Sequence, residues 1–208
     1  MKTMVYVDAF NLYYGAVKET SYKWLDLQAL CQIMLFPDNE IVGFKYFTAL
    51  VQPFPGKENQ PVRQQIYFRA LKTIPSLDIV TGYYLSHDVM MPLVNPEKGK
   101  NRFVKVIKTE EKGSDVNIAT HLLIDAFDNV YDCAVLISGD SDLTLPVQMV
   151  RNRFDKKVGV LNPQKRPCKS LKTNANFYKH IRESALRRSQ FPEELCDEHG
   201  IFHKPSTW

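Results

Sequence analysis

The sequence lacks the features that would mark a membrane or secreted protein. None of its 208 residues belongs to an apolar run of the length needed to cross a bilayer. Near the N-terminus, Asp8 interrupts the first apolar stretch, so we expect no signal peptide. The sequence therefore predicts a cytoplasmic protein with no membrane partner.

Cysteine is also scarce, and the four cysteines are far apart in the chain: Cys31, Cys133, Cys168 and Cys196. Because Cys133 falls in a predicted buried strand, a reduced protein is favoured over a disulfide scaffold. One group, Cys196-x2-His199-x3-His203, has the spacing of a zinc site that Cys168 would complete, although such a trio in a tail is more often incidental. The sequence contains no internal repeat or low-complexity segment.

Acidic residues are few in the stretch from Arg151 to Arg188, where twelve Lys and Arg residues face only Asp155 and Glu183. The net charge of +4 is modest, so the asymmetry lies in the distribution of charge. A basic flank beside an acidic centre indicates a polyanionic partner, with RNA the first candidate. The predicted phosphate-binding residues in this flank are Lys165, Arg166 and Lys169.

Strand-like and helix-like segments alternate along the chain, which predicts an α/β fold around a largely parallel sheet. Apolar, β-branched runs predict strands at residues 4–7, 41–51, 77–85, 102–108, 133–137, 157–161 and 177–181. Helical spacing of apolar residues predicts helices at 10–17, 24–35, 62–72, 116–127 and 143–150. Residues 52–61, 87–101 and 109–113 are expected to be irregular because they are polar or rich in proline and glycine.

The most informative stretch follows the apolar strand at 133–137. The small residues Ser138 and Gly139 allow a sharp turn, and Asp140 and Asp142 come directly after it. Two carboxylates at one strand end repel each other unless a cation or a proton lies between them. A divalent metal bound by oxygen ligands is the simplest solution. The alternative is that Asp142 only caps the next helix while Asp140 shapes the turn.

Two further acids stand in similar positions, Asp8 at the end of the first strand and Asp115 at the start of a helix. In a parallel sheet such positions lie along one edge, so the four aspartates are expected to converge. With one or two Mg²⁺ or Mn²⁺ ions the cluster would support metal-assisted hydrolysis of phosphodiesters. Asn11 and Ser138 are candidates to orient a water or a phosphate oxygen, and Lys112 is a candidate to hold the substrate phosphate.

Three stretches resemble, in this order, the motifs of the NYN-domain family of the PIN-like ribonuclease group: VYVDAFNLYY, EKGSDVNIATHLL and AVLISGDSDLTLPV. The resemblance implies a three-layer α/β/α sandwich and a Mg²⁺- or Mn²⁺-dependent ribonuclease, which we expect to be an endonuclease. It covers roughly residues 1–165, which we predict to be the nuclease domain, with 166–208 an extension that packs on it. By position the family's acids carry over to Asp8, Asp115, Asp140 and Asp142, with Asn11 as the accompanying polar residue.

One position departs from the family pattern. Many relatives have a further acid in the helix after the second motif, where this chain has His121. An imidazole there would make the acidic cluster less negative and would weaken metal binding or activity.

Two other functions are compatible with the sequence. A non-catalytic RNA-binding or scaffolding protein would use the same charge distribution, and His121 slightly favours it. A haloacid-dehalogenase-like phosphatase would explain the D-x-D-x-T pattern from Asp140 to Thr144, but it leaves Asp8 and Asp115 without a role. A homodimer is compatible with the sequence, which does not specify the RNA substrate.

Overall fold

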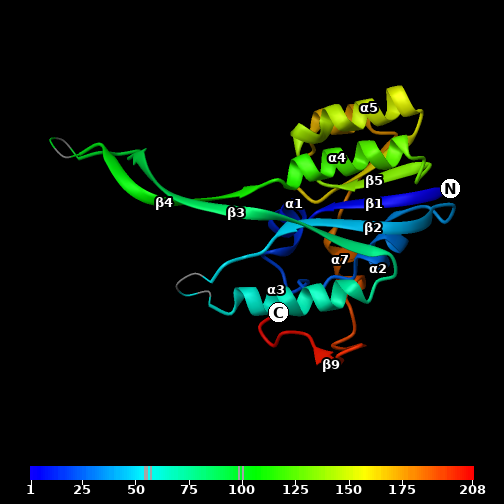
Figure 1. Ribbon diagram of the computed structural model, residues 1–208, viewed down its shortest axis with the longest axis horizontal. Helices are drawn as coiled ribbons and strands as arrows, with labels where there is room; N and C mark the ends of the chain where they lie inside the picture. Colours follow the sequence, from blue (N-terminus) through cyan, green and yellow to red (C-terminus); the bar gives the residue numbers. More distant parts are fainter. Residues whose placement is uncertain (54–55, 57, 98, 100) are drawn as a thin grey trace.

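The computed structural model describes residues 1–53, 56, 58–97, 99 and 101–208 (Figure 1). In this part of the chain a seven-stranded sheet has the order β4-β3-β2-β1-β5-β6-β7. The strands are β1 (Lys2–Asp8), β2 (Glu40–Ala49), β3 (Leu77–Pro92), β4 (Phe103–Lys112), β5 (Cys133–Ile137), β6 (Lys157–Asn162) and β7 (Phe177–His180). Neighbouring strands are parallel except β3 and β4, which are antiparallel. The predicted α/β fold with a mostly parallel sheet is confirmed.

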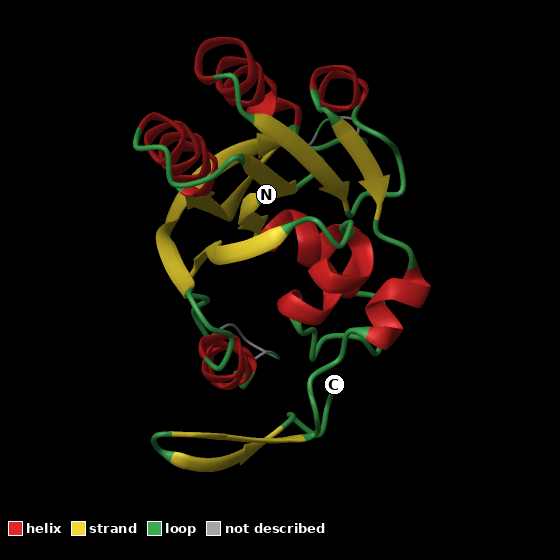
Figure 2. Cartoon of the chain, turned by 90° about the vertical axis from the view of Figure 1, so that its right-hand side faces the viewer, coloured by secondary structure: helices red, strands yellow, loops and turns green. Residues whose placement is uncertain are grey.

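Helices cover both faces of the sheet (Figure 2). One face carries α1 (Ala9–Leu12), the π-helical turn η1 (Tyr13–Val17), α2 (Leu27–Met34), α3 (Gln60–Lys72) and α7 (Glu183–Arg188). The other carries α4 (Ser114–Phe127), the 3₁₀ turn η2 (Ser141–Leu143), α5 (Thr144–Phe154) and α6 (Lys169–Asn174). Strand β1 separates the two cores because successive side chains point to opposite faces. Val5 and Val7 are buried in one core, and Met4 and Tyr6 in the other.

The hairpin of β3 and β4 extends far beyond the body of the molecule (Figure 1). The sequence predicted an irregular segment at 87–101 and a polar loop at 109–113. Both predictions were partly wrong: β3 continues through residues 87–92, and β4 continues to Lys112. The outer part of the hairpin is largely exposed, so the inside-outside alternation that marks a half-buried strand is weak there. Residues 98 and 100 of the first segment and 54–55 and 57 of the predicted loop at 52–61 lie outside the described residues.

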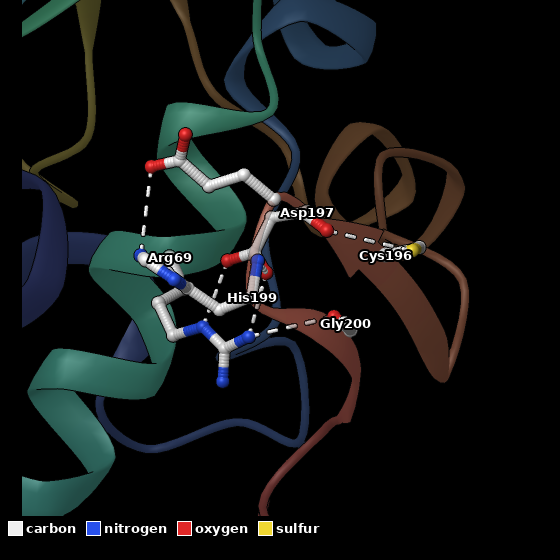
Figure 3. A network of polar contacts seen from close by, with 6 residues as sticks. Arg69, Cys196, Asp197, His199 and Gly200 are labelled. Carbon is white, nitrogen blue, oxygen red and sulfur yellow. Dashed lines mark hydrogen bonds and ion pairs between the residues drawn. The ribbon is translucent and has the colours of Figure 1, made fainter.

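The end of the chain packs against α2, α3 and the loop before α2. Phe191 and Phe202 are buried, and both contact the fully buried Trp24, with ring centroids 5.7 and 6.4 Å away. A short hairpin, β8 (Glu194–Asp197) and β9 (Gly200–His203), is attached to α3 by Arg69. The Arg69 guanidinium donates two hydrogen bonds to the Asp197 carboxylate, at 2.8 and 2.7 Å (Figure 3). Such paired hydrogen bonds fix orientation as well as distance.

Three absences hold for the described residues. The part of the chain that the structure describes has no helix that combines the length and apolar character needed to cross a membrane. The four cysteines are free. Within the same residues no group of three or more His, Cys, Asp and Glu side chains is placed to hold a metal ion. The Cys196, His199 and His203 spacing in the tail therefore does not form a zinc site with Cys168.

Candidate functional site

Asp8 lies at the carboxyl end of β1, where it also caps the N-terminus of α1. Its Oδ1 accepts a hydrogen bond from the Asn11 backbone N–H at 2.9 Å. Its Oδ2 accepts one from the Ser138 hydroxyl at 3.0 Å. The residue is only 4% exposed, and no described cation forms an ion pair with it. Burial is the main reason why the pKa of Asp8 is raised to about 6, and the charges of Asp115 and Asp140 contribute in the same direction.

The loop after β5 is adjacent to Asp8 because β1 and β5 are parallel neighbours, with Val7 opposite Ile137. Ser138 is fully buried, and its hydroxyl oxygen also accepts a hydrogen bond from the Asp140 N–H at 3.1 Å. The Ser138 hydroxyl thus both donates and accepts a hydrogen bond inside the protein. Ser138 orients Asp8 and the loop, and it does not face a substrate as the sequence had suggested.

Asp140 rather than Asp142 caps the turn that follows. Its Oδ1 accepts a hydrogen bond from the Asp142 N–H at 2.9 Å, which begins η2. The alternative is therefore correct for Asp140, which shapes the turn, and wrong for Asp142, which does not cap the helix that follows. Asp142 is exposed, and the other carboxylate oxygen of Asp140 has no hydrogen-bond partner among the described residues.

Asn11 holds three loops together. Its side-chain oxygen accepts hydrogen bonds from the Gly139 N–H and from the Gln164 amide, each at 2.9 Å. Gly139 lies so close to the loop after β6 that a Cβ atom there would be 2.5 Å from Oδ1 of Asn162. Sequence analysis missed Asn162 and Gln164. Their position directly after a predicted strand at the same edge of the sheet was the signal that could have found them.

Asp115 is brought to this edge by a different route from the other acids. It stands in the first turn of α4, directly after β4, which is antiparallel to β3 and returns along it. Glu111 accepts hydrogen bonds from the Ser114 N–H and hydroxyl, at 3.1 and 2.8 Å, and so caps this helix. The pKa of Asp115 is raised by burial first, then by the charges of Asp140, Glu111 and Asp142. The acids therefore share one electrostatic environment.

The oxygen donors at this edge suit a hard divalent cation in their chemistry. Asp8, Asp115, Asp140 and Asp142 have no ion-pair partner among the described residues, so a cation would relieve their repulsion. Across the described residues, however, no three acidic or other ligand side chains lie together as a metal-binding group. The arrangement is thus a set of candidate ligands and not an assembled coordination sphere.

A shallow hollow of about 430 Å³ lies over the three loops, and Asn11, Gly139, Asp140, Gln164 and Arg166 are among the residues that line it. Arg166 is the predicted phosphate-binding residue that borders this hollow. Lys165 and Lys169 are exposed on the adjoining loop and at the start of α6. Lys112 points to other partners, since its ammonium lies 3.2 Å from Glu110.

His121 belongs to a partly buried polar network beneath α4 and not to the acidic edge. The Lys45 ammonium lies 3.2 Å from Nδ1 of His121 and 2.6 Å from the Asp125 carboxylate, which also accepts a hydrogen bond from the Tyr6 hydroxyl at 2.7 Å. Burial, followed by the charge of Lys45, lowers the pKa of His121. The network supports the packing of α4 on the sheet.

Comparison with known proteins identifies the family. The family model described as NYN domain matches residues 2–182. A Pseudomonas putida (strain DSM 28022 / S16) protein named 6-hydroxy-3-succinoylpyridine 3-monooxygenase HspA is 29% identical over 236 aligned residues, covering 100% of this chain and 75% of that protein. A crystal structure of a Vibrio parahaemolyticus RIMD 2210633 protein of unknown function has a similar fold. It matches with a TM-score of 0.56 and 21% identity, over 88% of this chain and 93% of that one.

Proposed function

The chain belongs to the NYN-domain family, and on this premise we propose that it is a Mg²⁺- or Mn²⁺-dependent ribonuclease that hydrolyses RNA phosphodiester bonds at the acidic edge of its sheet. The observation that carries the proposal is the environment of Asp8. This carboxylate is buried, oriented by Ser138 and Asn11, and close enough to Asp115 and Asp140 for their charges to raise its pKa. Burying a carboxylate without a cationic partner costs free energy of folding, and such groups are found mainly at functional sites.

The residues of the site have distinct roles in this proposal. Asp8, Asp115, Asp140 and Asp142 would hold the metal, which when bound polarises the scissile phosphate and supplies a hydroxide for attack. Ser138 fixes the orientation of Asp8, as its hydrogen bond at 3.0 Å indicates.

The other polar residues would position the RNA. The Asn11 side-chain oxygen is occupied by Gly139 and Gln164, which leaves its NH₂ group as a donor to a phosphate oxygen. Arg166, at the rim of the hollow, is placed to hold a flanking phosphate, with Lys165 and Lys169 beside it. Asp8 and Asp115 share the electrostatic environment of Asp140 and would bind the metal with it. A haloacid-dehalogenase-like phosphatase would leave these two aspartates without a role.

The decisive experiment compares Asp140→Asn with the wild type on 5′-labelled RNA in Mn²⁺ and in EDTA. We expect the wild type to cut only with the metal, and the variant to be slower by about 100-fold or more because a metal-binding charge is lost. The matched control is Asp128→Asn, which removes an exposed aspartate at the far end of α4 and should cut at the wild-type rate.

Binding is measured on the same proteins. Asp140→Asn should still bind RNA, because Arg166 and the neighbouring basic residues are unchanged. If the wild type binds RNA but never cuts it with either metal, the non-catalytic RNA-binding function replaces the ribonuclease. Equal cutting by Asp140→Asn and wild type contradicts the assignment of the acidic edge.

A second candidate is a monooxygenase that acts on a small aromatic acid. It is favoured by the name of the Pseudomonas relative, and by the absence of three assembled metal-binding side chains in the described residues. In such a reaction one atom of O₂ enters the substrate, and the other is reduced to water by two electrons from an external donor such as NADH. Oxygen uptake that depends on both 6-hydroxy-3-succinoylpyridine and the donor would support this candidate, and no uptake would exclude that substrate.

A further inference from the structure

A separate cavity of about 450 Å³ has no lining residue in common with the hollow over the acidic loops. Its walls come from α1 and η1, from α3, from the end of β2, from the middle of β3 and from Trp208. None of the four candidate metal-binding aspartates lines it. The volume falls within the range of small-molecule binding sites, and the ligand that would fill the cavity can be inferred from its walls.

The walls are rich in aromatic rings, including Phe10, Tyr13, Tyr14, Tyr67, Tyr84 and Trp208. Several rings contact one another edge to face, with centroids 5.9 Å apart for Phe10 and Tyr84 and 5.8 Å apart for Tyr67 and Trp208. Such walls suit a flat aromatic ring, which can stack on some faces and meet the edges of others.

Tyrosine hydroxyls supply polar groups to the same cavity. The Tyr67 hydroxyl donates a hydrogen bond to the Leu25 carbonyl at 2.8 Å. Among the described residues, the hydroxyls of Tyr13, Tyr14, Tyr46 and Tyr84 have no hydrogen-bond partner, although each of these side chains lines the cavity. A ligand with hydrogen-bonding substituents on its ring would satisfy them.

The charged side chains of the lining are mainly positive. Lys18, Lys23 and Arg63 face a single carboxylate, Glu19, which lies 3.8 Å from the Lys18 ammonium. Lys23 and Arg63 are half-buried, and no described residue accepts a hydrogen bond from either side chain or forms an ion pair with it. Half-buried cations without a partner favour an anion at that end of the cavity.

We propose that this cavity binds a planar aromatic ring that carries an anionic group. The ring packs against Tyr13, Tyr84 and Trp208, and the anion pairs with Arg63 and Lys23. Two sources share this chemistry, a free aromatic carboxylate and a nucleotide, whose base is the ring and whose phosphate is the anion. The site goes beyond the proposed RNA hydrolysis and is built from other residues, so it is predicted whether or not the acidic edge is catalytic.

Tryptophan fluorescence gives a direct test, because both tryptophans of the chain are at this place: Trp208 lines the cavity, and Trp24 contacts it with ring centroids 6.2 Å apart. The probes are two matched pairs, 2-naphthoate with its neutral amide and AMP with adenosine. We expect the anionic member of at least one pair to bind about tenfold more tightly, because charge-assisted hydrogen bonds are stronger than neutral ones.

Arg63→Gln should abolish the difference between the anionic and neutral probes, and Lys72→Gln, in the last turn of the same helix, should preserve it. Lys23→Gln is the second test if Arg63→Gln does not fold. A preference for naphthoate identifies a free aromatic acid, and a preference for AMP identifies a nucleotide. The proposal is overturned if neither anion binds, or if Arg63→Gln and Lys23→Gln both retain the full preference. Asp140→Asn should bind like the wild type, which separates this site from the acidic edge.

Discussion

Replacing Asp8 with asparagine removes the buried charge of the candidate site and keeps the size of the side chain. In the folded protein without metal, the pKa of Asp8 is raised from 3.8 to about 6, mainly by burial. The native state therefore holds a proton at Asp8 more tightly than the unfolded chain does. The resulting stabilisation is complete below the unfolded value of 3.8 and is lost as the pH rises through about 6.

The size of the effect follows from the shift. Two pKa units correspond to about 3 kcal/mol in the free energy of unfolding. Asp8→Asn escapes this loss, but an asparagine has one accepting oxygen where the carboxylate receives hydrogen bonds from both Asn11 and Ser138. Losing one of these bonds costs about 1 kcal/mol, so we expect the variant to be more stable than the wild type by about 2 kcal/mol at pH 7.5. At pH 4 it should be no more stable, because Asp8 is then protonated in the wild type.

Urea denaturation in EDTA at a series of pH values measures this difference. Taking the difference between variant and wild type at each pH removes the contributions of other groups, such as His121 and Asp197. Asp128→Asn, which removes an exposed carboxylate far from the site, serves as the control. The reasoning is refuted if the Asp8→Asn difference is the same at pH 4 and pH 7.5. Adding Mn²⁺ should stabilise the wild type more than Asp8→Asn. A metal that binds the native state raises the stability of that state, and the variant lacks one of the candidate ligands.

The remaining predictions concern the basic flank, the tail and the partly buried network. Replacing Lys165, Arg166 and Lys169 with Gln should weaken RNA binding and flatten its salt dependence, because fewer counterions are released; an unchanged slope would move the RNA path elsewhere. Deleting residues 189–208 should lower the melting temperature by more than about 10 °C, because two buried phenylalanines are lost, and a truncated chain as stable as the full one would contradict the packing. Asp125→Ala should cost about 2–4 kcal/mol in urea denaturation, because it leaves the partly buried Lys45 ammonium without a carboxylate, and a loss below about 1 kcal/mol would show that water replaces the carboxylate.

The sequence alone determined the elements that have strong local patterns. Residues 133–137 were predicted as a strand, and β5 has those bounds, because a short apolar run with β-branched residues, followed by small turn residues, is typical of a fully buried strand. Asp8 and Asp140 could be placed at strand ends for the same reason, since small and polar residues follow each apolar run. The three motifs identified the NYN family, which the family match over residues 2–182 confirms.

The tertiary structure decided which of these residues meet. Asn11 comes from α1, and Gly139 and Gln164 come from two separate loops; their hydrogen bonds exist only because β5 lies between β1 and β6. Sequence periodicity reports one chain segment at a time, so it places Gln164 after a strand but does not show that Gln164 meets Asn11. Sequence analysis predicted Asp115 at this edge from the rule for parallel strands, whereas Asp115 reaches the edge through the antiparallel return of β4.

Some elements and roles were missed because they leave no local pattern in the sequence. Residues 87–92 of β3 are largely exposed, so no buried face imposed an alternating pattern on them, and residues 109–112 at the inner end of β4 are all polar, so they carry no apolar pattern. His121 of α4 contacts Lys45 of β2, which lies 76 residues away in the chain. The aromatic cavity likewise combines side chains that have no common pattern in the sequence. Local burial determines whether a segment is a strand or a helix, whereas a site depends on long-range packing that places several segments together.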